Sequence, residues 1–184
     1  MTKHQDENVV DLLQRQHEEI RKLFSKVEKG TGKARKDAFE QLRCLLAVHE
    51  TAEEEIVHPF ARRTIGNGER IIDARLKEEK EAKELLQELE KIGTDSAEFE
   101  SLLAGLRKAV ESHAEREEHV EFPDLLSRST PEQLKGMVAA VKAAEAIAPT
   151  HPHPGTESPT KNIALGPIAA VVDRTRDAIR KAMS

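Results

Sequence analysis

The sequence of 184 residues contains no tryptophan and no tyrosine, and aromatic residues make up only 3% of it. Aromatic side chains are enriched in strands, whereas Ala, Leu, Glu, Lys and Arg favour helices, so this composition disfavours β-sandwiches and β-barrels. The single cysteine excludes an intramolecular disulfide framework and a cysteine-rich zinc finger. We therefore expect an all-α protein.

Long apolar runs are also missing. No stretch approaches the roughly 18 consecutive apolar residues of a membrane span, and the polar segment 1–8 lacks the apolar core of a secretory signal. The charges are nearly balanced, with 29 basic and 34 acidic residues and a net charge of −5. The sequence has no basic stripe with interleaved aromatic residues, which is the usual footprint of nucleic-acid binding. These features predict a cytoplasmic protein whose partners include neither a membrane nor a nucleic acid.

Four segments of the chain repeat apolar residues at the spacing of an α-helix. Short breaks rich in glycine separate them, and Pro59 and Pro123 predict a kink or an end near their positions. Helices of this length joined by short loops predict an up-down-up-down four-helix bundle over residues 5–128. The four predicted helices cover residues 9–27, 34–60, 69–91 and 99–123.

The composition changes after residue 128. Thr130 and Pro131 are typical of a helix N-cap and first turn, and they predict an additional short helix within 129–147. A proline-rich linker is expected over 148–162, followed by a C-terminal amphipathic helix within 163–184. We expect this last helix to dock on the bundle or on another subunit, where it could form a homo-oligomer.

Polar residues interrupt the apolar stripe of every predicted bundle helix. They stand where the helical period requires an inward-facing apolar residue, and in the fourth helix the same stripe continues to Val120. Each helix therefore aims one or two groups that can bind a metal into the bundle. These residues are His17, His49, Glu53, Glu79, His113 and Glu117.

The spacing of these residues fits a shared cation. A histidine at position i and a glutamate at i+4 lie on one helix face, with Cβ atoms about 5–6 Å apart. Buried carboxylates without a partner are costly, so three inward glutamates are best explained by cations that neutralise them. Imidazole and carboxylate ligands without a thiolate suit iron, manganese or zinc. The sequence thus predicts a metal centre inside the bundle.

Glu79 has two competing explanations. It can be a ligand, or it can pair with Lys83 one turn later as an ordinary ion pair. Glu78, the preceding residue, also has apolar neighbours at helical spacing and stays an alternative ligand.

Other acidic and histidine residues near the motifs are expected to face solvent. Glu50, Glu54 and Glu118 flank the motif residues, although Glu50 could swing inward. The surface histidines are expected to include His58 and His119.

The chain resembles the hemerythrin-like HHE cation-binding domain over roughly residues 5–128. The resemblance rests on this pattern: His17 … His49-Glu50-Thr51-Ala52-Glu53 … His113-Ala114-Glu115-Arg116-Glu117-Glu118 … Phe122-Pro123. It implies a four-helix bundle that holds two non-haem irons, bridged by Glu53 and Glu117 and by an oxygen species. His17, His49 and His113 would then be terminal ligands. Members of the family carry O₂, sense oxygen, iron or nitric oxide, or decompose peroxide.

One departure from the family concerns the third helix, which usually supplies one or two histidines. No histidine lies between His58 and His113, and Glu79 stands at the corresponding position. A site with one imidazole fewer and one carboxylate more is predicted to be more anionic and to stabilise ferric iron.

We therefore expect a hemerythrin-like protein that handles or senses iron, oxygen, peroxide or NO at a di-iron centre. The alternative is a degenerate HHE bundle without a functional metal centre, which serves as a structural or interaction module. Whether the protein is an enzyme stays open, because an open metal position and a substrate channel cannot be read from the sequence.

Overall fold

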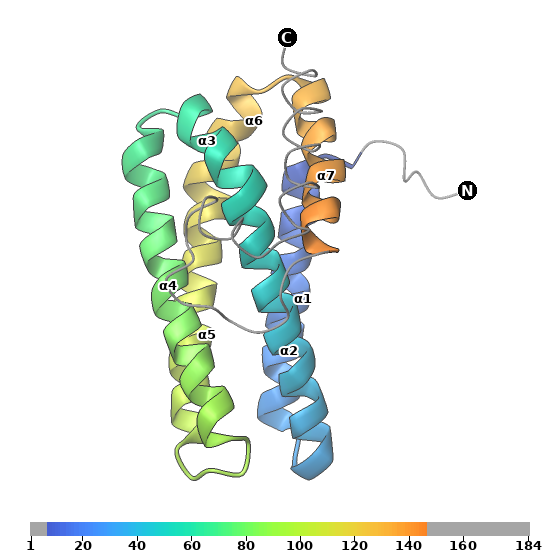
Figure 1. Ribbon diagram of the computed structural model, residues 1–184, viewed down its shortest axis with the longest axis vertical. Helices are drawn as coiled ribbons and strands as arrows, with labels where there is room; N and C mark the ends of the chain where they lie inside the picture. Colours follow the sequence, from blue (N-terminus) through green and yellow to red (C-terminus); the bar gives the residue numbers. More distant parts are fainter. Residues whose placement is uncertain (1–6, 147–184) are drawn as a thin grey trace, which may run out of the picture.

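The computed structural model describes residues 7–146, and the regular secondary structure within them is entirely helical (Figure 1). Seven α-helices and two five-residue π-helical segments, η1 and η2, follow one another along these residues. Their bounds are α1 Val9–Lys29, α2 Gly32–Ala52, η1 Glu53–Val57, α3 His58–Thr64, α4 Gly68–Ile92, α5 Phe99–Arg116, η2 Glu117–Glu121, α6 Phe122–Arg128 and α7 Pro131–Glu145.

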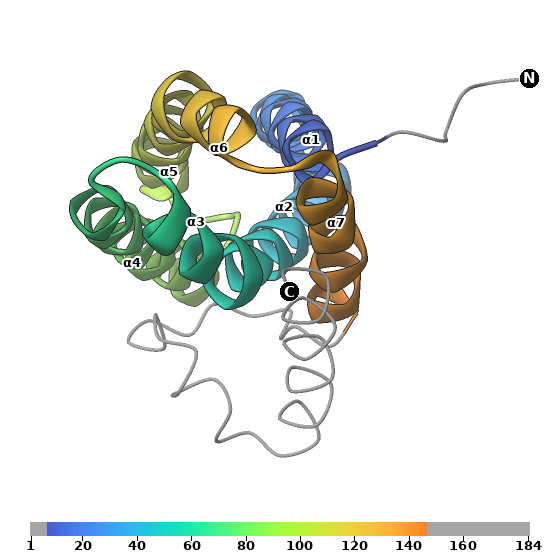
Figure 2. The same ribbon diagram turned by 90° about the horizontal axis from the view of Figure 1, so that it is seen from above.

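Four antiparallel arms form the bundle. The first is α1, the second is α2 continued by η1 and α3, the third is α4, and the fourth is α5 continued by η2 and α6 (Figures 1 and 2). Neighbouring arms pack against each other, with α1 against α2 and α5, and α4 against α3 and α5. The predicted all-α, up-down-up-down four-helix bundle is confirmed.

Local sequence signals set the ends of the arms. The Asn8 side chain accepts a hydrogen bond from the Val10 N–H at 2.8 Å, and the Asp11 carboxylate accepts one from the Asn8 N–H at 3.1 Å. This capping box fixes the start of α1. Asn67 and Gly93 have positive φ angles of 57° and 75°, and they lie immediately before and after α4. Both residue types tolerate this left-handed region, so these two residues account for where α4 begins and ends.

A π-turn precedes Pro59 in the second arm and Pro123 in the fourth. The N–H of His58 bonds to the carbonyl of Glu53, and the N–H of Phe122 bonds to the carbonyl of Glu117, five residues back in each case. A proline within a regular helix clashes with the carbonyl four residues earlier, and a wider turn relieves this clash. The arm therefore continues through Pro59, which lies in the first turn of α3, and ends only at Thr64.

The π-turn in the fourth arm changes which residues face inward. Val120, on the predicted inward stripe, is 50% exposed, whereas Glu121 is fully buried. The expected continuation of the stripe to Val120 is therefore wrong, because the extra residue in the turn rotates the following side chains.

Within residues 7–146 the apolar core forms two clusters. One occupies the end of the bundle that holds α3, α6 and α7, and it includes Leu13, Ile56, Phe60, Ile72 and Phe122. The other occupies the end with the α1–α2 and α4–α5 loops, and it includes Phe24, Leu42, Leu86, Phe99 and Leu106. A layer of buried polar residues lies between the two clusters.

Helix α7 lies outside the four arms and packs against α1, α2 and η1 (Figures 1 and 2). It starts at the Thr130–Pro131 signal, where Thr130 and Gln133 form a capping box. Its apolar face, including Met137 and Val141, is buried in the first cluster. The predicted linker 148–162 and C-terminal helix 163–184 lie outside the described residues. Among the helices of residues 7–146, none combines the length and apolarity needed to cross a membrane.

Gly68 offers a test of the contact between α3 and α4. A Cβ atom at Gly68 would clash with the backbone carbonyl of Arg62, so Gly68→Ala should lower the free energy of unfolding by about 1–3 kcal/mol. A Cβ atom at Gly105, which is exposed in α5, would meet only open space, and Gly105→Ala should stabilise the protein by up to about 1 kcal/mol. Urea unfolding of both variants measures the difference. Equal effects would show that α3 and α4 are not in close backbone contact at Gly68.

Candidate metal centre

Eight buried side chains from all four arms meet in the polar layer between the two apolar clusters. Their nitrogen and carboxylate oxygen atoms form four overlapping groups, within each of which the atoms lie within 4.8 Å of one another. All eight residues are at most 8% exposed. They are His17, His49, Glu53, His58, Glu79, His113, Glu117 and Glu121.

Glu53 and Glu117 lie at the centre of this arrangement. Every one of the four groups contains at least one of them, and one group contains both. The Nε2 atoms of three histidines point at these two carboxylates. Nε2 of His49 lies 3.3 Å from Glu53 Oε2, while Nε2 of His17 and of His113 each lie 3.3 Å from an oxygen of Glu117. The i, i+4 spacing of the motifs thus brings imidazole and carboxylate together as predicted.

The outer nitrogens of two of these histidines contact glutamates that are held by arginines. Nδ1 of His17 lies 2.8 Å from Glu118, and Arg21 donates to the same carboxylate oxygen at 2.9 Å. Nδ1 of His113 lies 3.1 Å from Glu78, which also accepts from Arg75. Such partners fix the ring orientation and leave Nε2 free for a cation. Glu118 is therefore not the solvated flanking residue that the sequence suggested.

His58 and Glu121 belong to this group of side chains, although neither is among the residues predicted from the sequence. His58, predicted at the surface, is 2% exposed, and its Nε2 lies 2.5 Å from Glu79 Oε1. Its Nδ1 lies 3.6 Å from Glu121. A helical period of 3.6 does not bring His58 to the face of Glu53, but the π-turn does, because it adds one residue between them. The sequence contains one indication of these turns. Pro59 and Pro123 follow the motif histidines at the same spacing of ten residues.

Glu79 points into the centre and Glu78 points away from it. Glu79 is 1% exposed and contacts His58, with its Oε1 also 3.8 Å from Nε2 of His113. The Glu78 side chain is 22% exposed and pairs with Arg75 and Arg116. The third arm contributes Glu79 and no histidine, and His58 of the second arm brings a fourth imidazole into the group of candidate ligands.

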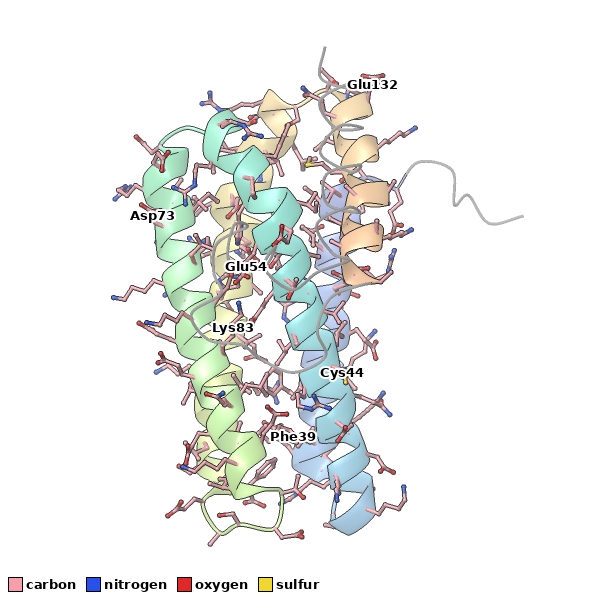
Figure 3. All side chains as sticks on the ribbon, viewed as in Figure 1. Phe39, Cys44, Glu54, Asp73, Lys83 and Glu132 are labelled. Carbon is pink, nitrogen blue, oxygen red and sulfur yellow. The ribbon has the colours of Figure 1, made fainter. Side chains whose placement is uncertain are left out.

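Lys83 does not form its ion pair with Glu79. It pairs with Glu54 of η1, and both side chains are almost fully buried (Figure 3). Glu50 is also buried, and burial raises its pKa to about 7, against the opposing charge of Lys83. Glu54, expected on a solvated face, therefore lies inside with Lys83, and Glu50 adopts the inward orientation that was its alternative.

Many polar atoms of the centre have no hydrogen-bond partner among the described residues. They include both carboxylate oxygens of Glu53, Glu117 and Glu121 and the Nε2 atoms of His17 and His113. Unpartnered buried carboxylates are strongly disfavoured, so the donor set fits bound cations. The four carboxylates of the centre carry a formal charge of −4 when ionised, which two divalent cations would balance.

The family model of the hemerythrin HHE cation binding domain matches residues 8–125. The chain belongs to this family. The resemblance drawn from the HHE motifs is thereby confirmed, and the matched residues contain all eight members of the centre. The match ends before α7, so this helix lies outside the recognised HHE domain.

Two curated relatives are similar to the chain. An uncharacterized hemerythrin-like protein of Schizosaccharomyces pombe is 26% identical over 138 residues, which cover 74% of this chain and 68% of the relative. A protein of Nostoc sp. named DNA nickase is 27% identical over 142 residues, which cover 77% of this chain but only 40% of the relative. The chain thus spans less than half of the Nostoc protein. No solved structure matches the chain.

The surroundings shift the pKa values of the two central carboxylates in opposite directions. Burial raises the pKa of Glu53 well above its ordinary value, and the charge of Glu117 raises it further. Burial acts on Glu117 in the same direction, but His113 and His17 outweigh it and hold the pKa of Glu117 well below its ordinary value. Burial also lowers the pKa of His49 to about 3, so this imidazole is neutral and can act as a ligand.

A cavity of about 20 Å³ borders the HHE centre. Three of the histidines, His17, His49 and His113, line it on one side. A space of this size holds about one water-sized molecule. The rest of the lining includes the apolar residues Ile20, Leu46, Ala82 and Val110 and the charged residues Arg21, Glu50, Glu79 and Glu111.

The pairing of Lys83 with Glu54 can be tested by double-mutant cycles on chelator-treated protein. We expect Lys83→Met and Glu54→Gln to show a coupling energy of about 1–3 kcal/mol in urea unfolding, because each single change leaves a buried polar partner behind. The matched cycle of Lys83→Met with Glu79→Gln should give a smaller coupling. A larger coupling with Glu79 would contradict the observed pairing.

Proposed function

We propose that this chain holds two transition-metal ions in a carboxylate-bridged dinuclear centre, with iron expected first and manganese or zinc as alternatives. The observation that carries the proposal is the position of Glu53 and Glu117, since each candidate ligand group contains at least one of them and one group contains both. Carboxylates from facing helices that serve two groups of ligands are typical of di-iron helix bundles. The bridging residues would be Glu53 and Glu117, and the terminal ones His17, His49, His58, Glu79, His113 and Glu121.

The function that fits this centre is the handling or sensing of a small molecule such as O₂, peroxide or NO. A bound non-haem iron pair supplies redox chemistry toward such molecules. The cavity beside His17, His49 and His113 supports the proposal, since its volume of about 20 Å³ is enough for one small molecule.

The chain's own residues would shape that chemistry in two ways. The apolar side chains of Ile20, Leu46 and Val110 in the cavity lining would limit the access of bulk water. The glutamates that contact the outer nitrogens of His17 and His113 hold these rings in place and raise their basicity as ligands. Both effects act on the centre without contacting the small molecule.

Metal content is the direct test of the proposal. Protein expressed with added iron should contain about two metal ions per chain by elemental analysis, because the overlapping ligand groups share two central carboxylates. Chelation should lower the melting temperature, since the cations neutralise buried carboxylates. A content below about one tenth of an ion per chain, with an unchanged melting temperature, would favour a degenerate HHE bundle that serves as a structural module.

The contribution of His58 provides a second test. His58→Ala should reduce iron content by about half or more, because it removes a buried nitrogen that belongs to two of the ligand groups. His119→Ala is the control, since His119 is exposed on η2 and contacts only the Glu115 carbonyl among the described residues. Elemental analysis and the visible absorption of the purified proteins measure the effect. Equal iron content in both variants would remove His58 from the centre.

A further inference from the structure

His49 is held differently from the other two motif histidines. Its Nδ1 lies 2.8 Å from the side-chain oxygen of Gln16, a neutral amide on α1, whereas His17 and His113 contact carboxylates. An amide oxygen can only accept, so the Nδ1–H of a neutral His49 donates to Gln16 Oε1. The other nitrogen, Nε2, then carries the free lone pair and faces Glu53 at 3.3 Å.

The Gln16 side chain could in principle present its other end to His49. Rotation of the amide by half a turn would place an NH₂ donor against Nδ1 and would favour the proton on Nε2, which blocks that nitrogen for a metal. The structure contains a group that selects one orientation. Gln16 Nε2 donates a hydrogen bond to Glu145 Oε1, and an ionised carboxylate has only acceptor atoms.

Glu145 is the last residue of α7, which lies beyond the matched HHE domain. The docking of α7 brings it to Gln16. Met137, Val141 and Ala144 of α7 are buried in the apolar cluster that also contains residues of α1 and η1 (Figures 1 and 2). The position of the Glu145 carboxylate is thus fixed by packing on the same arms that carry Gln16 and His49.

We propose that Glu145 is a positioning residue of the metal centre, which acts through Gln16 to set the tautomer of His49. Helix α7 is then a functional extension of the HHE domain rather than a neighbouring element. The inference rests on the proposed function, because it takes His49 as a metal ligand.

Glu145→Ala tests the inference, and Glu132→Ala is its matched control. Glu132 lies on the same helix at its opposite end and is exposed (Figure 3). Long-range ¹H–¹⁵N NMR of the metal-free full chain reports which nitrogen of His49 carries the proton. We expect Nδ1–H in the wild type and in Glu132→Ala, and a gain of the Nε2–H form in Glu145→Ala.

Zinc, a diamagnetic probe of the same ligand type, supplies the second readout by competition with a chelating dye. Its affinity should fall about tenfold in Glu145→Ala and stay unchanged in Glu132→Ala, which is the scale of effect for outer partners of metal-bound histidines. Glu145→Gln keeps an acceptor oxygen for the Gln16 amide and should retain more zinc affinity than Glu145→Ala.

The outcomes separate the two proposals. An unchanged His49 tautomer in Glu145→Ala overturns the inference, and so does a lowered melting temperature without change in tautomer or zinc affinity, which would assign α7 a purely structural role. A wild-type chain that binds no zinc and no iron overturns the proposed function instead. In that case the tautomer comparison still decides whether Glu145 orients His49.

Discussion

The burial of four carboxylates in one layer is the constraint on which the rest of the structure depends. Glu53, Glu79, Glu117 and Glu121 are at most 1% exposed, and three of them have no hydrogen-bond partner for either oxygen among the described residues. Such groups are tolerated only when positive charge or protons compensate them. The neighbouring side chains supply such compensation. Four imidazoles lie in the same layer, Lys83 lies beside it, and arginines bond to the outer glutamates.

The π-turn in the second arm brings one more donor to this layer than a regular helix would. In η1 the wider turn places His58 on the same side as Glu53. In η2 Glu121 follows Glu117 by four residues on the same face, and the wider turn leaves Val120 exposed. Pro59 and Pro123 favour these turns, because neither can donate the hydrogen bond of a regular turn. The third arm contributes no histidine to the candidate centre, and His58 of the second arm contributes its fourth imidazole.

The 3.6-residue helical period of the apolar residues predicts the bundle and most of the candidate centre. It gives a wrong position for a residue in or just after each π-turn. His17, His49, Glu53, Glu79, His113 and Glu117 all lie outside these turns or begin them, and the structure brings all six together. Beyond the turns the phase of the helix changes, so the period alone puts Val120 inside and His58 outside, and both placements are wrong. The ion-pair partner of Lys83 could not be predicted from the sequence either. Glu54 belongs to another arm, and its position follows from how the arms pack.

The division of the apolar core into two clusters has a mechanical consequence for the polar layer. Each ligand-bearing arm is anchored by apolar packing on both sides of its ligands, so it cannot bend outward at that level without disrupting one of the clusters. Mutual repulsion of the carboxylates is thus resisted by the packing at both ends of the bundle. In the proposed metal-binding role, this packing would hold the candidate ligands in place in advance, so that little of the binding free energy would be needed to order them.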